Sequence, residues 1–217
     1  MEAVRLLAVC VGRPQALGDG VTSGIRKQRV APGSWLELSS VNLDGDAQAD
    51  LRVHGGPDKA VYAYPSEHLQ AWRADLGQAL DEPAPFGENL STAGATEADV
   101  AVGERWAWGS ALLEVSQPRW PCPKLILHRG TPDVAQRLCD TARSGWYLRV
   151  VHEGRVPVDG PIEVVSRPDG PNVLDCFKAR TDLHHGDPAR AERVLATPAL
   201  AAQWRTHLEA GLRSLHR

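Results

Sequence analysis

The sequence contains no long apolar run, no excess of basic charge and few cysteines, and each absence excludes a class of protein. Its apolar stretches fall short of the ~20 residues that a membrane-spanning helix needs, so we expect no membrane association. The formal net charge of −3 gives no global basic field, so we expect no nucleic-acid partner and assign any anionic ligand to local basic clusters. The remaining composition is 42% hydrophobic and 24% charged, as in a globular protein that buries a full core.

The four cysteines form no recognisable metal or redox motif. No two of them stand in a C-x-x-C pair, which argues against a zinc ribbon or a thioredoxin-like motif. The N-terminal stretch also lacks the pattern of a secretory signal, because Arg5 precedes the apolar run and Gly12 ends it. We therefore expect a cytoplasmic protein whose thiols are reduced. The cysteines are Cys10, Cys122, Cys139 and Cys176.

Short apolar or alternating segments, separated by glycine and proline, predict a mainly β structure for roughly the first 165 residues. Residues 105–116 break at Gly109-Ser110 and predict a hairpin. Two helices are expected to interrupt the strands, one capped by Ser66 and one that begins at Thr131-Pro132. This pattern favours an antiparallel sandwich or barrel with peripheral helices. The other predicted strands are residues 4–11, 35–39, 60–64, 147–151 and 162–165.

The composition changes near Arg167, where residues 167–171 have the character of a linker or turn. Three helical stretches follow: residues 172–181, a segment after Asp187-Pro188, and a segment that begins at Thr197-Pro198. The last stretch has an apolar stripe at helical spacing, which predicts a small helical bundle. The predicted domains are a β-barrel domain over residues 1–167 and a three-helix domain over residues 168–217.

Cys122 lies in the segment with the sharpest chemical signal, residues 116–125. Three prolines stiffen this segment, so we expect the thiol on a rigid, non-helical ledge. Arg119 and Lys124 favour the thiolate, which is the form that binds metals or attacks electrophiles. A buried structural cysteine is the common alternative, but the flanking prolines and cations favour a functional role.

Three further segments give weaker signals. Residues 24–29 contain three basic residues and no acid, which suits either an anion-binding loop or an exposed polar loop. Residues 55–57, Gly-Gly-Pro, predict a tight turn that presents His54 either to a ligand or to solvent. In residues 86–91 a glycine precedes a glutamate and an asparagine, which indicates either a turn that aims two polar side chains at one place or an ordinary loop.

Five motifs and one further glycine, Gly103, occur in a fixed order along the chain. The motifs are Gly24-Ile25-x-Lys27, Asp44-Gly45-Asp46-x-Gln48-x-Asp50, His54-Gly55-Gly56-x-Asp58-Lys59-Ala60-Val61-Tyr62, Phe86-Gly87-Glu88-Asn89-Leu90 and Ser116-Gln117-Pro118-Arg119-x-Pro121-Cys122-x-Lys124-Leu125. Together they resemble a MOSC domain, the module shared by molybdenum-cofactor sulfurases and the mitochondrial amidoxime-reducing component. The resemblance is closest to the YiiM-like, stand-alone bacterial branch, which also carries a small C-terminal three-helix domain, so it covers nearly the whole chain.

The resemblance implies a MOSC-type β-barrel that binds the molybdenum cofactor, molybdopterin. Cys122 falls on the family's molybdenum ligand, and a soft thiolate suits a metal that is already bound by dithiolene sulfur. Basic and polar side chains would meet the phosphate and the pterin. Cys122, His54 and Arg119 are the expected catalytic residues, with His54 near the metal as a proton donor. The expected cofactor-binding residues are Arg26, Lys27, Arg52, His54, Gly55, Glu88, Asn89, Gln117, Arg119 and Lys124.

The related enzymes reduce N-hydroxylated purines and amidoximes with electrons from a flavin-dependent reductase. The resemblance therefore implies an oxidoreductase, monomeric or homodimeric, that detoxifies N-hydroxylated base analogues with such a reductase as its partner. Two alternatives remain open. One is a molybdenum-cofactor or sulfur carrier that holds a persulfide on Cys122. The other is a thiol-dependent hydrolase or transferase in which His54 acts as the base for Cys122.

Overall fold

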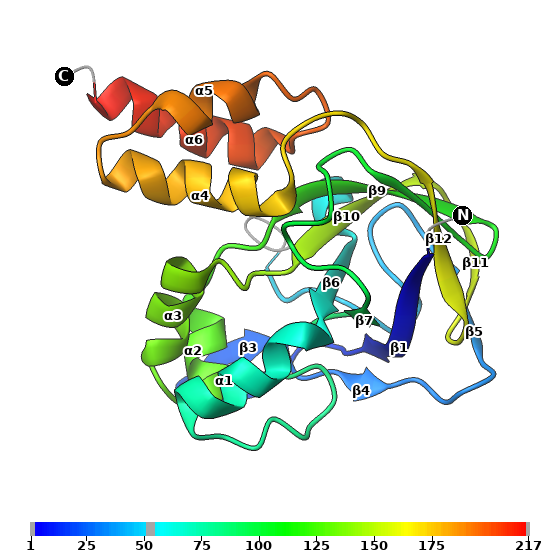
Figure 1. The fold of residues 1–217 in the computed structure, drawn as a ribbon. Helices are drawn as coiled ribbons and strands as arrows, with labels where there is room; N and C mark the ends of the chain where they lie inside the picture. The colour runs from blue at the N-terminus through cyan, green and yellow to red at the C-terminus, as the bar shows by residue number, and fades with distance from the viewer. Residues whose placement is uncertain (1–2, 51–54, 216–217) are drawn as a thin grey trace.

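The computed structural model describes residues 3–50 and 55–215, and it packs a layer of C-terminal helices against one side of a β-barrel (Figure 1). Seven of the described strands close the barrel in the order β12-β8-β9-β10-β6-β7-β1, because β12 also pairs with β1. A short strand, β4 (Gln28–Arg29), adds to β1 outside the closure. The barrel strands are β1 (Ala3–Val11), β6 (Val61–Pro65), β7 (Leu90–Ala93), β8 (Arg105–Trp108), β9 (Ala111–Pro118), β10 (Trp146–His152) and β12 (Pro161–Ser166).

The predicted antiparallel barrel with peripheral helices is confirmed, with one parallel pairing between β6 and β7. Ala63 lies opposite Leu90 in that pairing. Parallel neighbours need a crossover connection, and the segment that contains α1 (Leu69–Leu76) supplies it. The predicted hairpin is also confirmed, because β8 and β9 pair antiparallel around Gly109. A Cβ at Gly109 would lie 2.3 Å from the Arg155 carbonyl oxygen, so this turn needs glycine.

Two small ribbons lie outside the barrel sheet. The predicted strand at residues 35–39 is present as β5 (Trp35–Leu38), and it pairs with β11 (Gly154–Pro157). The hairpin of β2 (Gln15–Gly18) and β3 (Val21–Ser23) was not predicted. Its strands are too short to show an alternation of apolar and polar residues in the sequence.

The helices before residue 167 depart from the prediction at their starts. Ser66 does not cap α1, because residues 66–68 form a 3₁₀ turn, η2 (Ser66–His68), before the α-helix begins. Thr131 does accept a hydrogen bond from the Asp133 N–H at 3.3 Å, next to the start of α3 (Asp133–Thr141). A 3₁₀ turn, η1 (Pro57–Lys59), follows the Gly-Gly pair.

Cys122 lies outside any helix, as the prediction of a non-helical ledge requires, but the helix that begins directly after it was not predicted. Cys122 has extended backbone, with φ −136° and ψ 159°, but Pro123 begins a helix, α2 (Pro123–Arg129). Proline suits the first position of a helix, because its fixed φ is helical and the N–H that it lacks would have no partner within the helix. Pro123, one of the prolines expected to stiffen this segment, is therefore a helix start.

The three predicted C-terminal helices are present and lie together, and the first of them lies against the barrel strand β9 (Figure 1). The last helix begins at Ala202, because Thr197 and Leu200 first form a separate turn through a backbone hydrogen bond of 3.2 Å. Ser116 of β9 accepts a backbone hydrogen bond from the Ala201 N–H at 3.0 Å, so the bundle is tied to the barrel. The predicted boundary at residue 167 stays a prediction. The helices are α4 (Val173–His184), α5 (Ala189–Leu195) and α6 (Ala202–Leu215).

Large side chains fill the barrel. Trp106 and Trp146 meet edge to face with ring centroids 5.9 Å apart, and both are fully buried. The indole N–H of Trp106 donates to the buried carboxylate of Glu104 at 2.7 Å, which satisfies a polar group inside the core. Among the described residues, no helix is long and apolar enough to cross a lipid bilayer.

Shortening a barrel side chain should destabilise the fold. Leu113→Ala removes a fully buried side chain from β9, and we expect the free energy of unfolding to fall by about 2–5 kcal/mol. Leu127→Ala is the control, because Leu127 is exposed on α2 and should change the value by about 0.5 kcal/mol or less. Urea unfolding followed by circular dichroism measures both. Equal effects of the two substitutions would contradict this core.

Candidate functional site

A cleft of about 600 Å³, counting the space at its mouth that is open to solvent, gathers residues from all five motifs. Its lining contains four basic or thiol side chains from the predicted site, and the rest are mainly loop residues. The lining residues are Ser23, Gly24, Ile25, Lys27, Asp46, Ala47, Gln48, Ala49, Gly55, Lys59, Tyr62, Gly87, Asn89, Arg119, Cys122, Lys124 and Tyr147.

Cys122 lies at the junction of this cleft with a second one. It is half-buried, and its carbonyl oxygen accepts the Leu125 N–H at 2.9 Å in the first turn of α2. The second cleft measures about 750 Å³ by the same measure and shares Lys59, Cys122 and Tyr147 with the first. Cys122 therefore borders two clefts, one on the side of the loops and one on the side of the C-terminal helices.

A buried carboxylate joins the loops around the first cleft. Asp46 accepts hydrogen bonds from the Gly12 N–H at 2.8 Å and from the Asn89 amide at 3.0 Å, and it forms an ion pair with Lys27. All these groups are largely withdrawn from water, so each hydrogen bond satisfies a group that would otherwise be costly to bury. The charge of Lys27 is thereby balanced within the protein.

Asn89 is bonded chiefly to the protein itself. Its amide nitrogen donates to the Cys10 carbonyl at 3.1 Å as well as to Asp46, and its oxygen accepts the Tyr62 N–H at 3.1 Å. Asn89 therefore connects the start of β7 with β1 and β6. The prediction that it contacts a cofactor stays a prediction, and its two amide hydrogens are already used.

Arg119 is a buried cation with no carboxylate partner among the described residues. Its guanidinium donates to the Phe86 carbonyl at 2.8 Å and to the Tyr62 hydroxyl at 3.4 Å, and it lies 4.9 Å from the centre of the Tyr62 ring. Only 5% of the residue is exposed. Buried charges are normally paired, so this arrangement suits an anionic ligand at the cleft.

Two buried amide oxygens near Cys122 have no hydrogen-bond partner within the described part of the chain. They are Oε1 of Gln48, in the first cleft, and Oε1 of Gln117, whose residue lines the second cleft. A Cβ at Gly55 would lie 2.8 Å from the Gln48 oxygen, so the glycine leaves that oxygen open. Unsatisfied buried acceptors are rare, and a bound ligand with N–H groups would explain both.

The remaining predicted residues fall in different places. Arg26 is exposed and does not line the cleft, and its guanidinium reaches the Ala16 carbonyl at 3.5 Å. Glu88 is buried next to the cleft, where it accepts hydrogen bonds from the Phe86 N–H and the Ser91 hydroxyl. Arg52 and His54 lie outside the described residues. Their predicted roles, like those of Arg26 and Glu88, stay predictions.

The sequence reasoning did not single out Lys59, Tyr62, Gln48 or Tyr147 as site residues, although all four line the cleft. Gln48, Lys59 and Tyr62 belong to the quoted motifs, so membership in a motif would have identified them as site residues where residue polarity did not. Tyr147 was placed on a predicted strand, and its position opposite Gln117 across β9 and β10 depends on the sheet register.

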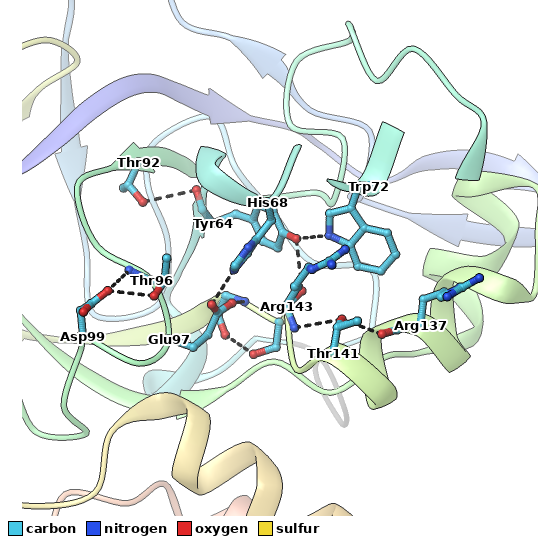
Figure 2. Close-up of polar contacts among 12 residues, drawn as sticks. Tyr64, His68, Trp72, Thr92, Thr96, Glu97, Asp99, Arg137, Thr141 and Arg143 are labelled. Carbon is cyan, nitrogen blue, oxygen red and sulfur yellow. Dashed lines mark hydrogen bonds and ion pairs between the residues drawn. The ribbon is translucent and has the colours of Figure 1, made fainter. Parts of the chain in front are cut away.

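A chain of hydrogen bonds from His68 through Glu97 and Gly145 positions the backbone of Arg119. Figure 2 shows His68 and Glu97 turned toward each other, with His68 Nε2 2.6 Å from Glu97 Oε2. The other oxygen of Glu97 accepts the Gly145 N–H at 2.6 Å, and the Gly145 carbonyl accepts the Arg119 N–H at 3.3 Å. A Cβ at Gly145 would lie 2.4 Å from the Ala63 carbonyl, so the close approach of this loop to β6 requires glycine. Gly145, directly before β10, is thus fixed by Glu97 through its N–H and by Arg119 through its carbonyl.

Comparisons of sequence and of structure with known proteins agree on one family. The model of the MOSC domain matches residues 50–163. Protein YiiM of Escherichia coli is 39% identical over 199 residues, which cover 90% of this chain and 87% of YiiM. The crystal structure of YiiM from Escherichia coli superposes with a TM-score of 0.80 at 32% identity, over 99% of this chain and 94% of that one. A protein of Gibberella moniliformis named Reductase is 35% identical over 75% of this chain but only 29% of its own length.

The Asp46 carboxylate should be essential to the stability of the cleft. Asp46→Ala leaves Lys27 as a buried, unpaired cation, so we expect the free energy of unfolding to fall by about 3–5 kcal/mol. Asp44→Ala is the matched control, because Asp44 is exposed and should change the value by only about 0.5 kcal/mol. Chemical denaturation of both variants tests this. A mild effect at Asp46 would mean that Lys27 finds another partner or reaches solvent.

Glu88 should make the fold less stable as the pH rises. Burial raises the pKa of its carboxyl to about 7, whereas an ordinary glutamate has a value of 4.5. The folded protein therefore binds this proton more tightly, so the free energy of unfolding falls as the pH rises through about 7, by roughly 3 kcal/mol at most. Denaturation at pH 5 and pH 8 should show a smaller fall for Glu88→Gln than for the wild type. Parallel pH dependences of the two proteins would contradict the shift.

Proposed function

Because the chain belongs to the MOSC domain family, we propose that it is a molybdenum-cofactor-dependent oxidoreductase that reduces small N-hydroxylated compounds. The domain type, which is that of molybdenum-cofactor sulfurases, supports the association with the cofactor, and the relative named Reductase supports an enzyme. The observation that carries the proposal is the convergence of the Cys122 thiol and the unpaired, buried Arg119 guanidinium in one cleft. A thiolate suits a soft metal, and the cation suits an anionic group of the same ligand.

The residues present fit this cofactor in three respects. Cys122 offers the single protein sulfur that the metal would need, and no cluster of three or more His, Cys, Asp or Glu side chains lies within the described residues to bind a metal independently. Arg119 and Lys124 offer positive charge for the phosphate. The open oxygen of Gln48 would accept an N–H group of the pterin.

When bound, the cofactor would supply two-electron redox chemistry for reduction of the substrate's N–O bond. The balanced reaction converts R–NHOH, two electrons and two protons into R–NH₂ and water. We propose that a flavin-dependent reductase provides the electrons. The side chains of this protein hold the reactants, exclude water from the buried Arg119 side of the cleft and supply protons.

Lys59 is placed to supply a proton. It lines both clefts, and burial lowers the pKa of its ammonium group, which favours release of the proton from Nζ. Its ammonium also donates to the Gln203 side chain on α6, which fixes its position. The proton-donor role predicted for His54 remains part of the proposal, beside Lys59.

Substitution of Cys122 tests the cofactor assignment. The full chain would be purified from a host that makes the molybdenum cofactor, and molybdenum would be measured by elemental mass spectrometry. We expect Cys122→Ala to lower the molybdenum content by at least about tenfold, since even the loss of an outer partner costs 10–100-fold in metal affinity. Cys139→Ala is the control, because Cys139 is also half-buried but lines neither cleft.

The reaction is then assayed with an N-hydroxylated purine and a flavin reductase, and Cys122→Ser should lose most of the rate while Cys139→Ala keeps it. Full molybdenum content and full rate in Cys122→Ser would show that Cys122 is not the ligand. If the wild type carries neither molybdenum nor pterin, the proposal fails. A persulfide on Cys122 would then favour a sulfur carrier, and thiol-dependent turnover would favour a hydrolase or transferase.

A further inference from the structure

Glu97 is a buried carboxylate that lies outside both clefts. It stands in the segment between β7 and β8, only 3% of the residue is exposed, and it lines neither cleft. Burying a carboxylate is costly unless its oxygens are hydrogen-bonded. The groups that bind these two oxygens therefore indicate which part of the molecule the side chain holds in place.

Each oxygen of this carboxylate binds a different segment. Oε2 lies 2.6 Å from Nε2 of His68 in η2, as Figure 2 shows, and Oε1 accepts the Gly145 N–H at 2.6 Å. The His68 ring in turn packs against the Tyr64 ring, with the centroids 5.9 Å apart. His68 therefore fixes the carboxylate, and the carboxylate fixes the loop of residues 143–145.

Two tyrosines of β6 bind the same loop. The Tyr64 hydroxyl donates to the Arg143 carbonyl at 3.1 Å, a contact that Figure 2 also shows. The Tyr62 hydroxyl donates to the Ser144 carbonyl at 2.7 Å. The loop is thus held by the tyrosines of a barrel strand through two of its carbonyl groups and by Glu97 through its last N–H.

This loop supports Arg119 at both ends. The Gly145 carbonyl accepts the Arg119 N–H at 3.3 Å, which holds the backbone. The Tyr62 hydroxyl, which Ser144 orients, accepts a hydrogen bond from the Arg119 guanidinium at 3.4 Å. The Phe86 carbonyl accepts a second one from the same group at 2.8 Å. An arginine side chain has many rotamers, and excluding them costs free energy, so these contacts fix in advance a group that would otherwise be ordered by its ligand.

We propose that Glu97, paired with His68, is a positioning residue that holds the Arg119 guanidinium in place for an anionic group bound in the first cleft. It acts through Gly145 and Tyr62 and contacts no ligand itself. A site whose side chains are ordered before binding holds its ligand more tightly, because the entropy of ordering is lost during folding. The inference rests on the proposed function for the identity of the ligand, and on this hydrogen-bond network for the positioning.

Two measurements without turnover test the positioning. The full chain is purified from a host that makes the molybdenum cofactor, and Glu97→Ala should lower molybdenum and pterin per folded protein by about tenfold or more, as the loss of an outer partner does at other metal sites. The Arg119 amide hydrogen should exchange with solvent about tenfold faster or more, measured by nuclear magnetic resonance, because the Gly145 N–H has lost a charged acceptor. Glu97→Gln keeps an oxygen that accepts the Gly145 N–H, so it should retain most of the cofactor and the slow exchange.

Two control variants separate positioning from a loss of stability. Asp99→Ala removes an exposed carboxylate from the same segment, where it accepts hydrogen bonds from the N–H and the hydroxyl of Thr96, and it should change neither measurement. Leu113→Ala lowers the overall stability, and it should not accelerate the Arg119 amide more than the other barrel amides. If Glu97→Ala accelerates all barrel amides equally, or if Asp99→Ala loses as much cofactor, the inference is overturned.

A second variant serves if Glu97→Ala does not fold, as judged by its thermal unfolding. His68→Phe keeps a ring beside Tyr64 and removes the partner of the Glu97 carboxylate, so the same two changes are expected in the same direction. Retained cofactor together with unchanged exchange of the Arg119 amide in this variant would overturn the inference.

The two measurements also separate this inference from the proposed function. If the wild type carries neither molybdenum nor pterin, the proposed function fails, and the exchange of the Arg119 amide alone decides whether Glu97 positions this residue. If the wild type carries the cofactor and reduces an N-hydroxylated compound while Glu97→Ala is loaded to the same extent, the proposed function stands and the positioning role is wrong.

Discussion

One buried carboxylate connects the loops that line the first cleft. Asp46 receives hydrogen bonds or an ion pair from three separate segments, through Gly12, Lys27 and Asn89. Asn89 extends the network into the barrel, because it also bonds to the backbones of Cys10 and Tyr62. The loops around the cleft have little regular secondary structure of their own, so their shape depends on this shared acceptor and on tight glycine contacts such as that of Gly24 with Ala47.

The same network sets the charge of the cleft. Asp46 neutralises Lys27, so the positive charge that the first cleft offers to a ligand comes from other lining residues, among them Arg119 and Lys124, which share the cleft with Cys122. A chain with a net charge of −3 can therefore present a cationic binding site, because local pairing decides the field that a ligand meets. Burial makes this field stronger than the same charge would produce in water.

The sequence pattern predicted an antiparallel sandwich or barrel, the hairpin and the three C-terminal helices, because alternation and helical periodicity report directly on which face is buried. The choice of the barrel came from the resemblance to the MOSC family. It also placed Lys27, Arg119, Cys122 and Lys124 in a single site through their motifs, and all four line the first cleft. It could not show that Asn89 uses its amide inside the protein, since a polar residue in a turn has the same pattern whether it meets a ligand or a backbone. Pro123 illustrates the same ambiguity. A proline can interrupt a helix or begin one, and the sequence pattern does not show that Pro123 begins α2.

The C-terminal helices contribute to only one of the two clefts. Every described residue that lines the first cleft comes from the first 147 residues, whereas the second cleft also needs side chains from α4 and α6. Cys122, Lys59 and Tyr147 belong to both, so the proposed chemistry lies where the two clefts meet. The bundle therefore shapes only the second cleft, whereas Asp46 and Arg119 belong to the first.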